Sequence, residues 1–145
     1  MWYKRWLRRE EAETAYARAH VDEVTEVWQP TEANEAAWKA VRHHFGIGAF
    51  GVNAFVARAD GGDLIEPHDE AGRHEELYVV LEGLARFTID GDLVEAPAGT
   101  LVHVSPESHR QAEGVTAGTT VLVVGAERGK AFEPSAWELR YTQKA

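Results

Sequence analysis

Cysteine is absent from this chain of 145 residues, which excludes disulfide bonds, thiolate nucleophiles and sulfur metal ligands. Any metal site must therefore use nitrogen and oxygen ligands. No apolar run approaches the roughly 18 residues of a membrane-spanning helix, and the N-terminus lacks the apolar stretch of a secretory signal. Basic residues are outnumbered, 15 against 24 acidic ones, for a net charge of −9. We therefore expect a cytoplasmic protein whose partners include neither nucleic acid nor a membrane.

Glycine is missing from the first part of the chain, and all 13 glycines lie from Gly46 onward. The glycine-free part is rich in Ala, Glu and Arg. Its apolar residues recur at helical spacing over Trp2–Leu7, and a second helix is expected from about Glu32 to His43. Segment 21–28 fits either a short strand or a helical turn. We predict a helical arm over residues 1–44 that packs on the rest of the protein or on a partner chain.

The remainder of the chain, residues 45–145, consists of short apolar segments separated by turn residues. The pair Asp90-Gly91 is a strong hairpin signal, with strand residues on both sides. The expected strands are 48–58, 64–68, 77–81, 84–89, 92–95, 100–104, 109–112 and 119–124. This pattern predicts an all-β sandwich or barrel followed by a C-terminal tail that packs back on it.

A cluster of histidines and glutamates surrounds one of the expected turns. Side chains alternate along a strand, so His68 shares a face with Glu70, and His74 shares a face with Glu76. A hairpin through residues 71–73 would bring both pairs to one place. Imidazole and carboxylate suit a divalent transition metal such as Fe, Zn, Mn or Ni. The alternative is that these side chains are ordinary solvated groups.

Residues further along the chain could complete such a site. His103 lies in an expected strand and His109 begins the next one, so either could close the coordination sphere from across the barrel. Three arginines, Arg58, Arg86 and Arg110, also lie in expected strands. An arginine that faces inward could hold a carboxylate, although a solvated position on the outer face is the commoner one.

Two stretches of the sequence resemble the two motifs of the cupin superfamily. Residues 62–83 match the first motif, with Gly62, His68, Glu76 and Gly83 at its spacing. The run from Glu75 to Gly83 is highly typical of it. Residues 91–109 match the second motif, in which Gly91 precedes Pro97-Ala98-Gly99 and His109 follows a turn that contains proline. The resemblance implies a double-stranded β-helix, the jelly-roll barrel of cupins, and it extends over roughly residues 46–128.

The resemblance also implies a metal site inside the barrel, with His68, Glu76 and His109 as ligands. The sequence departs from the family pattern at Glu70, which stands where a second histidine is usual, and in a shorter turn before His109. A fourth ligand would come from Glu70 or His74, and the residues do not decide between them. His103 is the reserve ligand if the shorter turn misplaces His109.

Three functions follow from these expectations. The first is a metal-dependent enzyme that acts on a small organic molecule, as an oxygenase or as an isomerase or cyclase, in which Glu70 or His74 could serve as acid or base if it is not a ligand. The second is a non-catalytic module that binds or senses a small ligand. The third is a degenerate barrel with a structural role. Cupins of a single domain commonly pair, so a homodimer is expected.

Overall fold

The computed structural model describes residues 15–26 and 35–142, and it consists mainly of β-strands. The elements are β1 (Ala37–Lys39), α1 (Val41–Phe45), β2 (Gly51–Val56), β3 (Gly62–His68), β4 (His74–Glu82), β5 (Leu84–Ile89), β6 (Asp92–Pro97), β7 (Leu101–Val104), β8 (Arg110–Gly114), β9 (Thr120–Glu127) and α2 (Ala136–Thr142). All eight strands expected from the sequence are present, with bounds shifted by a few residues.

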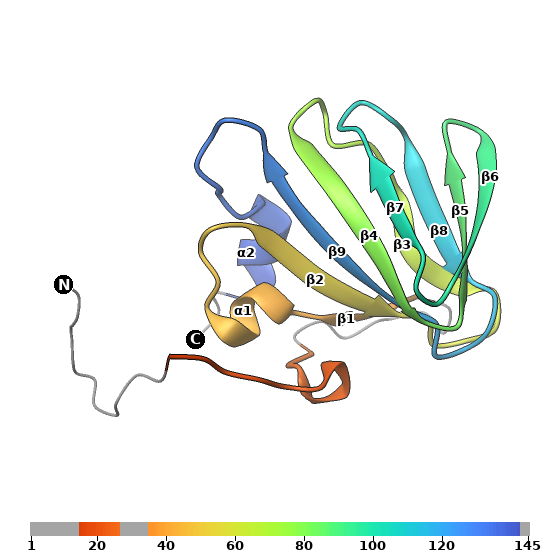
Figure 1. Cartoon of the computed structure of the whole chain (residues 1–145), viewed down its shortest axis with the longest axis horizontal. Helices are drawn as coiled ribbons and strands as arrows, with labels where there is room; N and C mark the ends of the chain where they lie inside the picture. Colours follow the sequence, from red (N-terminus) through yellow and green to blue (C-terminus); the bar gives the residue numbers. More distant parts are fainter. Residues whose placement is uncertain (1–14, 27–34, 143–145) are drawn as a thin grey trace.

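The strands form two antiparallel sheets that face each other (Figure 1). One sheet has five strands in the order β1-β2-β9-β4-β7, and the other has four in the order β3-β8-β5-β6. Consecutive strands repeatedly change sheet, which gives the expected jelly-roll barrel. The Asp90-Gly91 hairpin joins β5 to β6, and both of its residues have a positive φ, 50° and 88°. This left-handed backbone is the conformation for which Asp-Gly is selected.

The period of β4 determines which side chains enter the barrel. Tyr78 and Val80 are buried, whereas Leu77 and Leu81 on the other face are exposed. Glu76 lies on the same face as Tyr78, because side chains two residues apart share a face. A strand that is mostly apolar therefore carries one glutamate into the interior.

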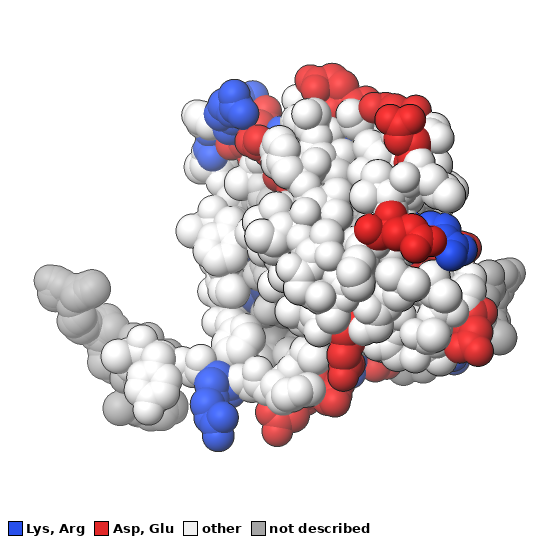
Figure 2. All heavy atoms as spheres, turned by 45° about the vertical axis from the view of Figure 1, so that its right-hand side comes forward, with Lys and Arg blue, Asp and Glu red and all other residues white. Residues whose placement is uncertain are grey.

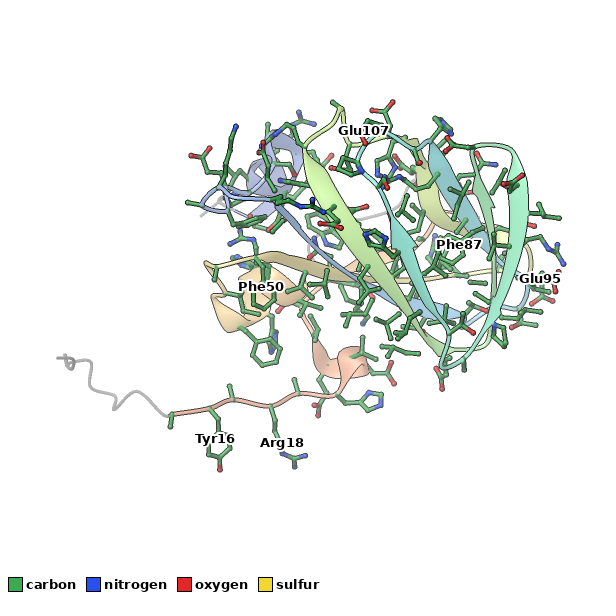
Figure 3. The ribbon with its side chains drawn as sticks, turned by 45° about the horizontal axis from the view of Figure 1, so that its top comes forward. Tyr16, Arg18, Phe50, Phe87, Glu95 and Glu107 are labelled. Carbon is green, nitrogen blue, oxygen red and sulfur yellow. The ribbon has the colours of Figure 1, made fainter. Side chains whose placement is uncertain are left out.

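The core lies between the two sheets and is mainly apolar. Phe87 on β5 meets Tyr78 on β4, with ring centroids 5.3 Å apart, and Figure 3 shows Phe87 between the sheets. Leu64 and Val121 are also buried in this cluster. Burying such side chains is the main stabilising contribution to the barrel.

The helical arm predicted over residues 1–44 is only partly described. The expected helix around Trp2–Leu7 lies outside the described residues. The helix expected from Glu32 to His43 is wrong over residues 35–40, where β1 forms and pairs with β2. Ala and Glu favour a helix locally, but pairing with an open sheet edge outweighs a propensity of a few tenths of a kcal/mol per residue.

Segment 21–28, for which the sequence allowed either a short strand or a helical turn, shows some of each over residues 21–26. A 3₁₀ turn spans Val21–Glu23, and Glu26 forms an isolated bridge with Lys39 on β1. The domain boundary predicted near residue 45 stays a prediction.

The surface carries its charges unevenly. Figure 2 shows one side of the barrel that is largely free of charged groups, with acidic groups near its ends. The five-stranded sheet exposes Leu77, Leu81 and Leu101 on its outer face. In the described ranges, no helix is long and apolar enough to cross a membrane. The homodimer and the cytoplasmic location stay predictions.

Two glycine turns offer a matched test of packing against backbone conformation. Gly83 (φ +78°) and Gly91 (φ +88°) both have left-handed backbone, but a Cβ at Gly83 would lie 2.4 Å from Thr119 Oγ1, whereas one at Gly91 would meet nothing within 4 Å. Both Gly→Ala substitutions should lower the free energy of unfolding by about 1 kcal/mol, because alanine is strained in left-handed backbone. Gly83→Ala should lower the free energy of unfolding by about 1–3 kcal/mol more than Gly91→Ala, because the new methyl group would displace Thr119. Urea unfolding measures the difference, and equal losses would contradict the packing argument.

Candidate functional site

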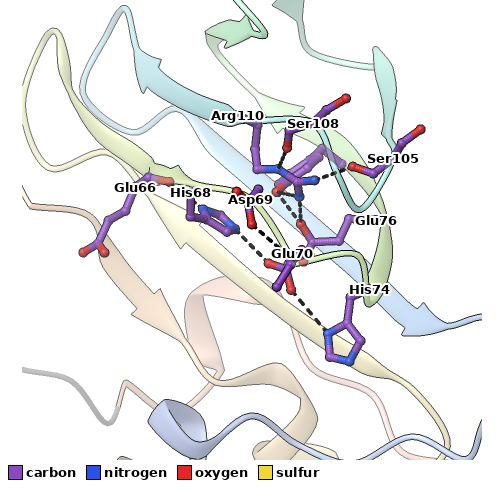
Figure 4. A network of polar contacts seen from close by, with 11 residues as sticks. Glu66, His68, Asp69, Glu70, His74, Glu76, Ser105, Ser108 and Arg110 are labelled. Carbon is purple, nitrogen blue, oxygen red and sulfur yellow. Dashed lines mark hydrogen bonds and ion pairs between the residues drawn. The ribbon is translucent and has the colours of Figure 1, made fainter.

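A cavity of about 620 Å³ opens inside the barrel and reaches to the C-terminal helix. Its walls are side chains of β2, β3, β4, β9 and α2, together with the turn that joins β3 to β4. Such a volume suits a small organic molecule. Of the polar groups that the sequence singled out, four lie along this wall, namely His68, Glu70, His74 and Glu76 (Figure 4).

The turn between β3 and β4 brings His68, Glu70 and Glu76 together. One nitrogen or oxygen atom of each lies within 4.8 Å of the others, and all three are partly buried. His68 Nε2 is 2.9 Å from Glu70 Oε2. Within the turn, Asp69 accepts a hydrogen bond from the amide of Ala71, which has left-handed backbone at φ 55°. Asp is favoured at such a position because its short side chain can satisfy the backbone of a turn.

The hairpin expected between these strands does not form, although the turn between them does bring the side chains together. The strands on either side of the turn do not pair with each other, since β3 pairs with β8 and β4 pairs with β9 and β7. The turn instead crosses from one sheet to the other. Glu70 lies in this crossing and not on a strand, and its amide donates to the carbonyl of Pro106. The cluster thus forms at the gap between the sheets.

The hydrogen bonds of His68 leave one ring nitrogen directed at the cluster. Nδ1 is 2.6 Å from the backbone carbonyl oxygen of Glu66, which can only accept, so Nδ1 carries the hydrogen. Nε2 is the atom that faces Glu70. In metal sites, a ligating histidine typically donates its other N–H to a carbonyl or carboxylate in this way.

Glu76 is held by a buried arginine and a tyrosine. Arg110 Nη1 is 2.5 Å from Glu76 Oε1, and the Tyr78 hydroxyl donates to the same oxygen at 2.6 Å. The other guanidinium nitrogens of Arg110 donate to the carbonyls of Ser105 and Ser108. Arg110 is 0% exposed, so this interaction is shielded from water. One carboxylate oxygen of Glu76, Oε2, has no such bond and remains available to the cavity.

The pKa values of the cluster reflect both burial and neighbouring negative charge. Burial is the main cause that raises the pKa of Glu76, and the charge of Glu70 adds to it, although the Tyr78 bond opposes both. The hydrogen bond to Glu70 raises the pKa of His68. Burial likewise raises the pKa of Tyr78, which keeps its phenol protonated. The site therefore favours an additional positive charge beside its carboxylates.

Space for Glu76 comes from the strand next to it. A Cβ on Gly125 of β9 would lie 2.9 Å from the carbonyl oxygen of Glu75 and 3.0 Å from Glu76 Cγ. Across β9, Gly51 faces Phe132, whose ring would be 2.9 Å from a Cβ there. Two glycines in register thus make room for the side chain of Glu76 and for the ring of Phe132.

The other residues predicted for the site lie around this group or away from it. His74 Nδ1 is 3.5 Å from Glu70 Oε1, and its ring centroid is 5.9 Å from that of Phe132. His74 is therefore a neighbour of the cluster, whereas Glu70 is a member of it. His103 lies between the inward-facing Val102 and Val104, so it points outward and contacts Glu75 at 2.6 Å.

His109 is exposed and is not brought to the cluster. Its amide donates to Asp90 Oδ1 at 2.8 Å, outside the cavity. The next residue, Arg110, is the one that enters the barrel, where it lies opposite His68 in the pairing of β3 with β8. The expected strand therefore exists, but the side chain that it contributes to the interior is one residue later.

Two of the three candidate arginines lie in strands, whereas Arg58 lies beyond the end of β2, where a strand was wrongly expected. Arg110 faces inward, and the carboxylate that it holds is that of Glu76 in the chain itself. Arg86 faces outward and pairs with Glu95 and Glu113. Arg58 is exposed, and its Nη1 donates to the carbonyl of Glu35 at 3.5 Å.

Sequence reasoning did not find the part of the cavity near α2. Trp38, Asn53 and Glu138 line it, and all three are buried. An asparagine at the centre of the apolar run of β2 is the signal that could have indicated Asn53, since a polar side chain there needs a partner. Nothing in the sequence pattern links Glu138 to the barrel.

The Arg110–Glu76 pair gives a stability prediction. Arg110→Met should lower the free energy of unfolding by about 3–5 kcal/mol, because it leaves a buried carboxylate without its charge partner. The matched control Arg86→Met, at a solvated surface pair, should show no comparable loss. Urea unfolding of both variants tests this, and similar losses would mean that burial of Arg110 contributes nothing particular.

Comparison with known proteins gives structural relatives but no sequence relatives. No family model matches the sequence, and no curated protein does. KdgF from Halomonas sp. is similar with a TM-score of 0.58 and 18% identity, over 70% of this chain and 86% of KdgF.

Two further solved structures are described in their names as cupins. A cupin protein from Bacteroides fragilis has a TM-score of 0.58 and 17% identity, over 85% of this chain and 93% of that one. An RmlC-like cupin from Desulfovibrio desulfuricans has the same TM-score and 23% identity, over 77% and 97%. These likenesses agree with the two motifs in the sequence, and the chain has the cupin fold.

Proposed function

We propose that the barrel binds one divalent transition metal, Fe, Zn, Mn or Ni, and acts on a small organic molecule held in the adjoining cavity. The observation that carries this proposal is the convergence of His68, Glu70 and Glu76 within 4.8 Å at the cavity wall. An imidazole with two carboxylates is a donor set that such metals accept. The raised pKa of His68, caused mainly by the hydrogen bond to Glu70, also indicates that the cluster favours a cation.

Each side chain would have a separate role. His68 would ligate through Nε2, and Glu66 would fix the ring through its carbonyl. Glu70 would ligate with an oxygen, and Glu76 with Oε2, since its Oε1 is bound to Arg110 and Tyr78. A bound metal would supply a Lewis acid that polarises a substrate oxygen.

His74 is the group best placed to move a proton. It lines the cavity and lies beside Glu70, which orients its ring. A histidine ring can take up or release a proton near neutral pH. We therefore assign His74 as the acid or base of an isomerase, cyclase or oxygenase reaction.

The structural relatives support a small-molecule ligand but span several chemistries. One similar structure is a predicted oxalate decarboxylase from Thermotoga maritima, and another is Streptomyces PAC13 with uridine. Both are only 15% identical to this chain, so neither substrate is transferred here.

A second candidate function is binding of a small molecule without a metal. The observation in its favour is Arg110, which already places a positive charge 2.5 Å from Glu76 Oε1. The metal content of the protein separates the two functions.

Metal content should depend on His68 and not on the exposed histidines. The untagged protein should contain about one transition metal per chain, and His68→Ala should reduce it to less than about a tenth, because the only imidazole of the cluster is lost. Elemental mass spectrometry measures both, with circular dichroism as a check of the fold.

Two matched controls make this test specific. His103→Ala removes an exposed imidazole from β7, and His109→Ala removes one just before β8. Both variant proteins should retain the metal. Loss of metal in His109→Ala would instead support the ligand that the sequence resemblance implied. A native protein that neither contains nor takes up metal would favour the second candidate function.

Metal affinity should fall as pH is lowered. Ligation through Nε2 requires a neutral His68, and Glu70 raises the pKa of this ring above 6.5, so the proton competes from near-neutral pH downward. The affinity should drop about tenfold per pH unit once the pH is below this pKa. Competition for Zn²⁺ with a chromophoric chelator measures it. A constant affinity through that range would contradict ligation by His68.

A further inference from the structure

The same cavity has a second polar region, which is formed by residues other than the His68 cluster and includes side chains of α2. Its side chains come from β1, β2 and α2, namely Trp38, Asn53, Trp137, Glu138 and Tyr141. None of these residues belongs to the candidate metal site.

Two buried polar atoms in this region have no hydrogen-bond partner. Trp38 Nε1 and Asn53 Oδ1 are the unpaired ones within residues 15–26 and 35–142. The two side chains belong to residues that are only 3% and 7% exposed. Buried donors and acceptors in folded proteins are nearly always paired, so these two atoms need a partner that the described residues do not provide.

The orientation of the Asn53 amide is determined by Glu138. Asn53 Nδ2 donates to Glu138 Oε1 at 3.5 Å, and Arg42 donates to the other oxygen of the same carboxylate. A carboxylate in an ion pair only accepts, so the amide nitrogen must face it. The amide oxygen is therefore directed elsewhere and remains a free acceptor.

The Trp38 ring is held in place by other aromatic rings. Its centroid is 4.8 Å from that of Trp137 and 5.9 Å from that of Tyr141. Trp38 pairs with Phe55 in the register of β1 with β2, and Asn53 lies two residues before Phe55. Trp38 and Asn53 therefore share the inner face of the sheet at diagonal positions. Both residues line the same cavity, and together they supply one unpaired donor and one unpaired acceptor.

We propose that this region, which we call the Trp38–Asn53 subsite, binds hydroxyl groups of an uncharged polyhydroxy compound such as a sugar or polyol. A hydroxyl both accepts, as Trp38 Nε1 requires, and donates, as Asn53 Oδ1 requires. A carboxylate has no proton for Asn53, and either a carboxylate or a phosphate would bring negative charge close to the carboxylate of Glu138. An ammonium group cannot accept from the indole. The neighbouring rings offer apolar faces to the C–H groups of such a ligand.

This inference deepens the proposed function and rests on it for the reacting end of the molecule. The substrate would place hydroxyl groups under α2 and direct its reacting part to His68, Glu70 and Glu76, which line the same cavity. The Trp38–Asn53 subsite would then select the substrate, while the other cluster carries the chemistry.

Indole N–H resonances of the full-length ¹⁵N-labelled protein test the subsite. Trp38→Phe identifies the Trp38 resonance. The probes are glucose, galactose, xylose, ribose and myo-inositol, each titrated at millimolar concentration, with acetate and inorganic phosphate as anionic probes. At least one polyol should shift the Trp38 resonance to saturation. No response to any polyol, or a saturable response to an anion only, would overturn the proposal.

A substitution of Asn53 links the response to its proposed acceptor. Asn53→Leu keeps the volume of the side chain and should weaken polyol binding at least about tenfold, because one hydrogen bond is lost. Asn53→Ala serves in the same way if the leucine variant does not fold. The matched control Gln111→Ala removes an exposed amide on β8 and should leave the affinity unchanged. An unchanged affinity in the folded Asn53 variant would overturn the proposal.

The variant His68→Ala separates this inference from the proposed function. It should lose metal but keep the Trp38 response, because Trp38 and Asn53 are not members of the His68 cluster. A native protein that binds metal and no polyol would overturn the subsite alone. A native protein that binds a polyol and no metal would overturn the metal proposal and leave the subsite standing.

Discussion

The buried contact between Arg110 and Glu76 is the interaction on which the rest of the site depends. Arg110 comes from the four-stranded sheet and Glu76 from the five-stranded one, so the ion pair joins the two layers of the barrel. The same guanidinium binds the carbonyls of Ser105 and Ser108. It therefore also fixes the loop from β7 to β8. A charge this deeply buried is tolerated only because every part of it is paired.

This contact also limits what the cavity can do. With Oε1 of Glu76 bound to Arg110 and Tyr78, the carboxylate can offer only its second oxygen to a ligand. Arg110 offsets one of the two negative charges of Glu70 and Glu76. The cluster keeps enough negative charge to hold His68 in its protonated form more firmly than usual. A dication in place of that proton would relieve the same excess of charge, which is the physical link between the pKa values and the proposed metal.

The fold was largely predictable because its signals are local. Turn residues such as Asp90-Gly91 and the alternation in β4 determine where strands begin, end and face. The helix expected over residues 32–43 is wrong over residues 35–40 because there the local signal is misleading. Ala37–Lys39 has the composition of a helix, but it forms a strand because β2 offers an unpaired edge. Such a long-range partner leaves no mark in the segment itself.

The site was less predictable, because a side chain changes sides with every residue along a strand. His109 and Arg110 are neighbours, and the register of β8 decides which one enters the barrel. The sequence shows that both lie near the start of a strand but not where the alternation begins. His68, Glu70 and Glu76 were predicted because they surround one short turn and because His68 and Glu76 match the cupin spacing, although that turn is a crossing between sheets and not a hairpin.

The cavity itself requires regions that no single motif contains. Trp38 precedes the two cupin-like motifs and Glu138 follows them, yet both line the same space as His68. Arg42 and Asn53 hold Glu138 against the barrel, and Trp38 packs on Trp137. The barrel motifs therefore place the reactive groups, whereas the segments outside the motifs form the wall that a ligand meets. Because α2 lies outside both sheets, its residues are the part of this wall that can adapt to a particular substrate with the least effect on the barrel.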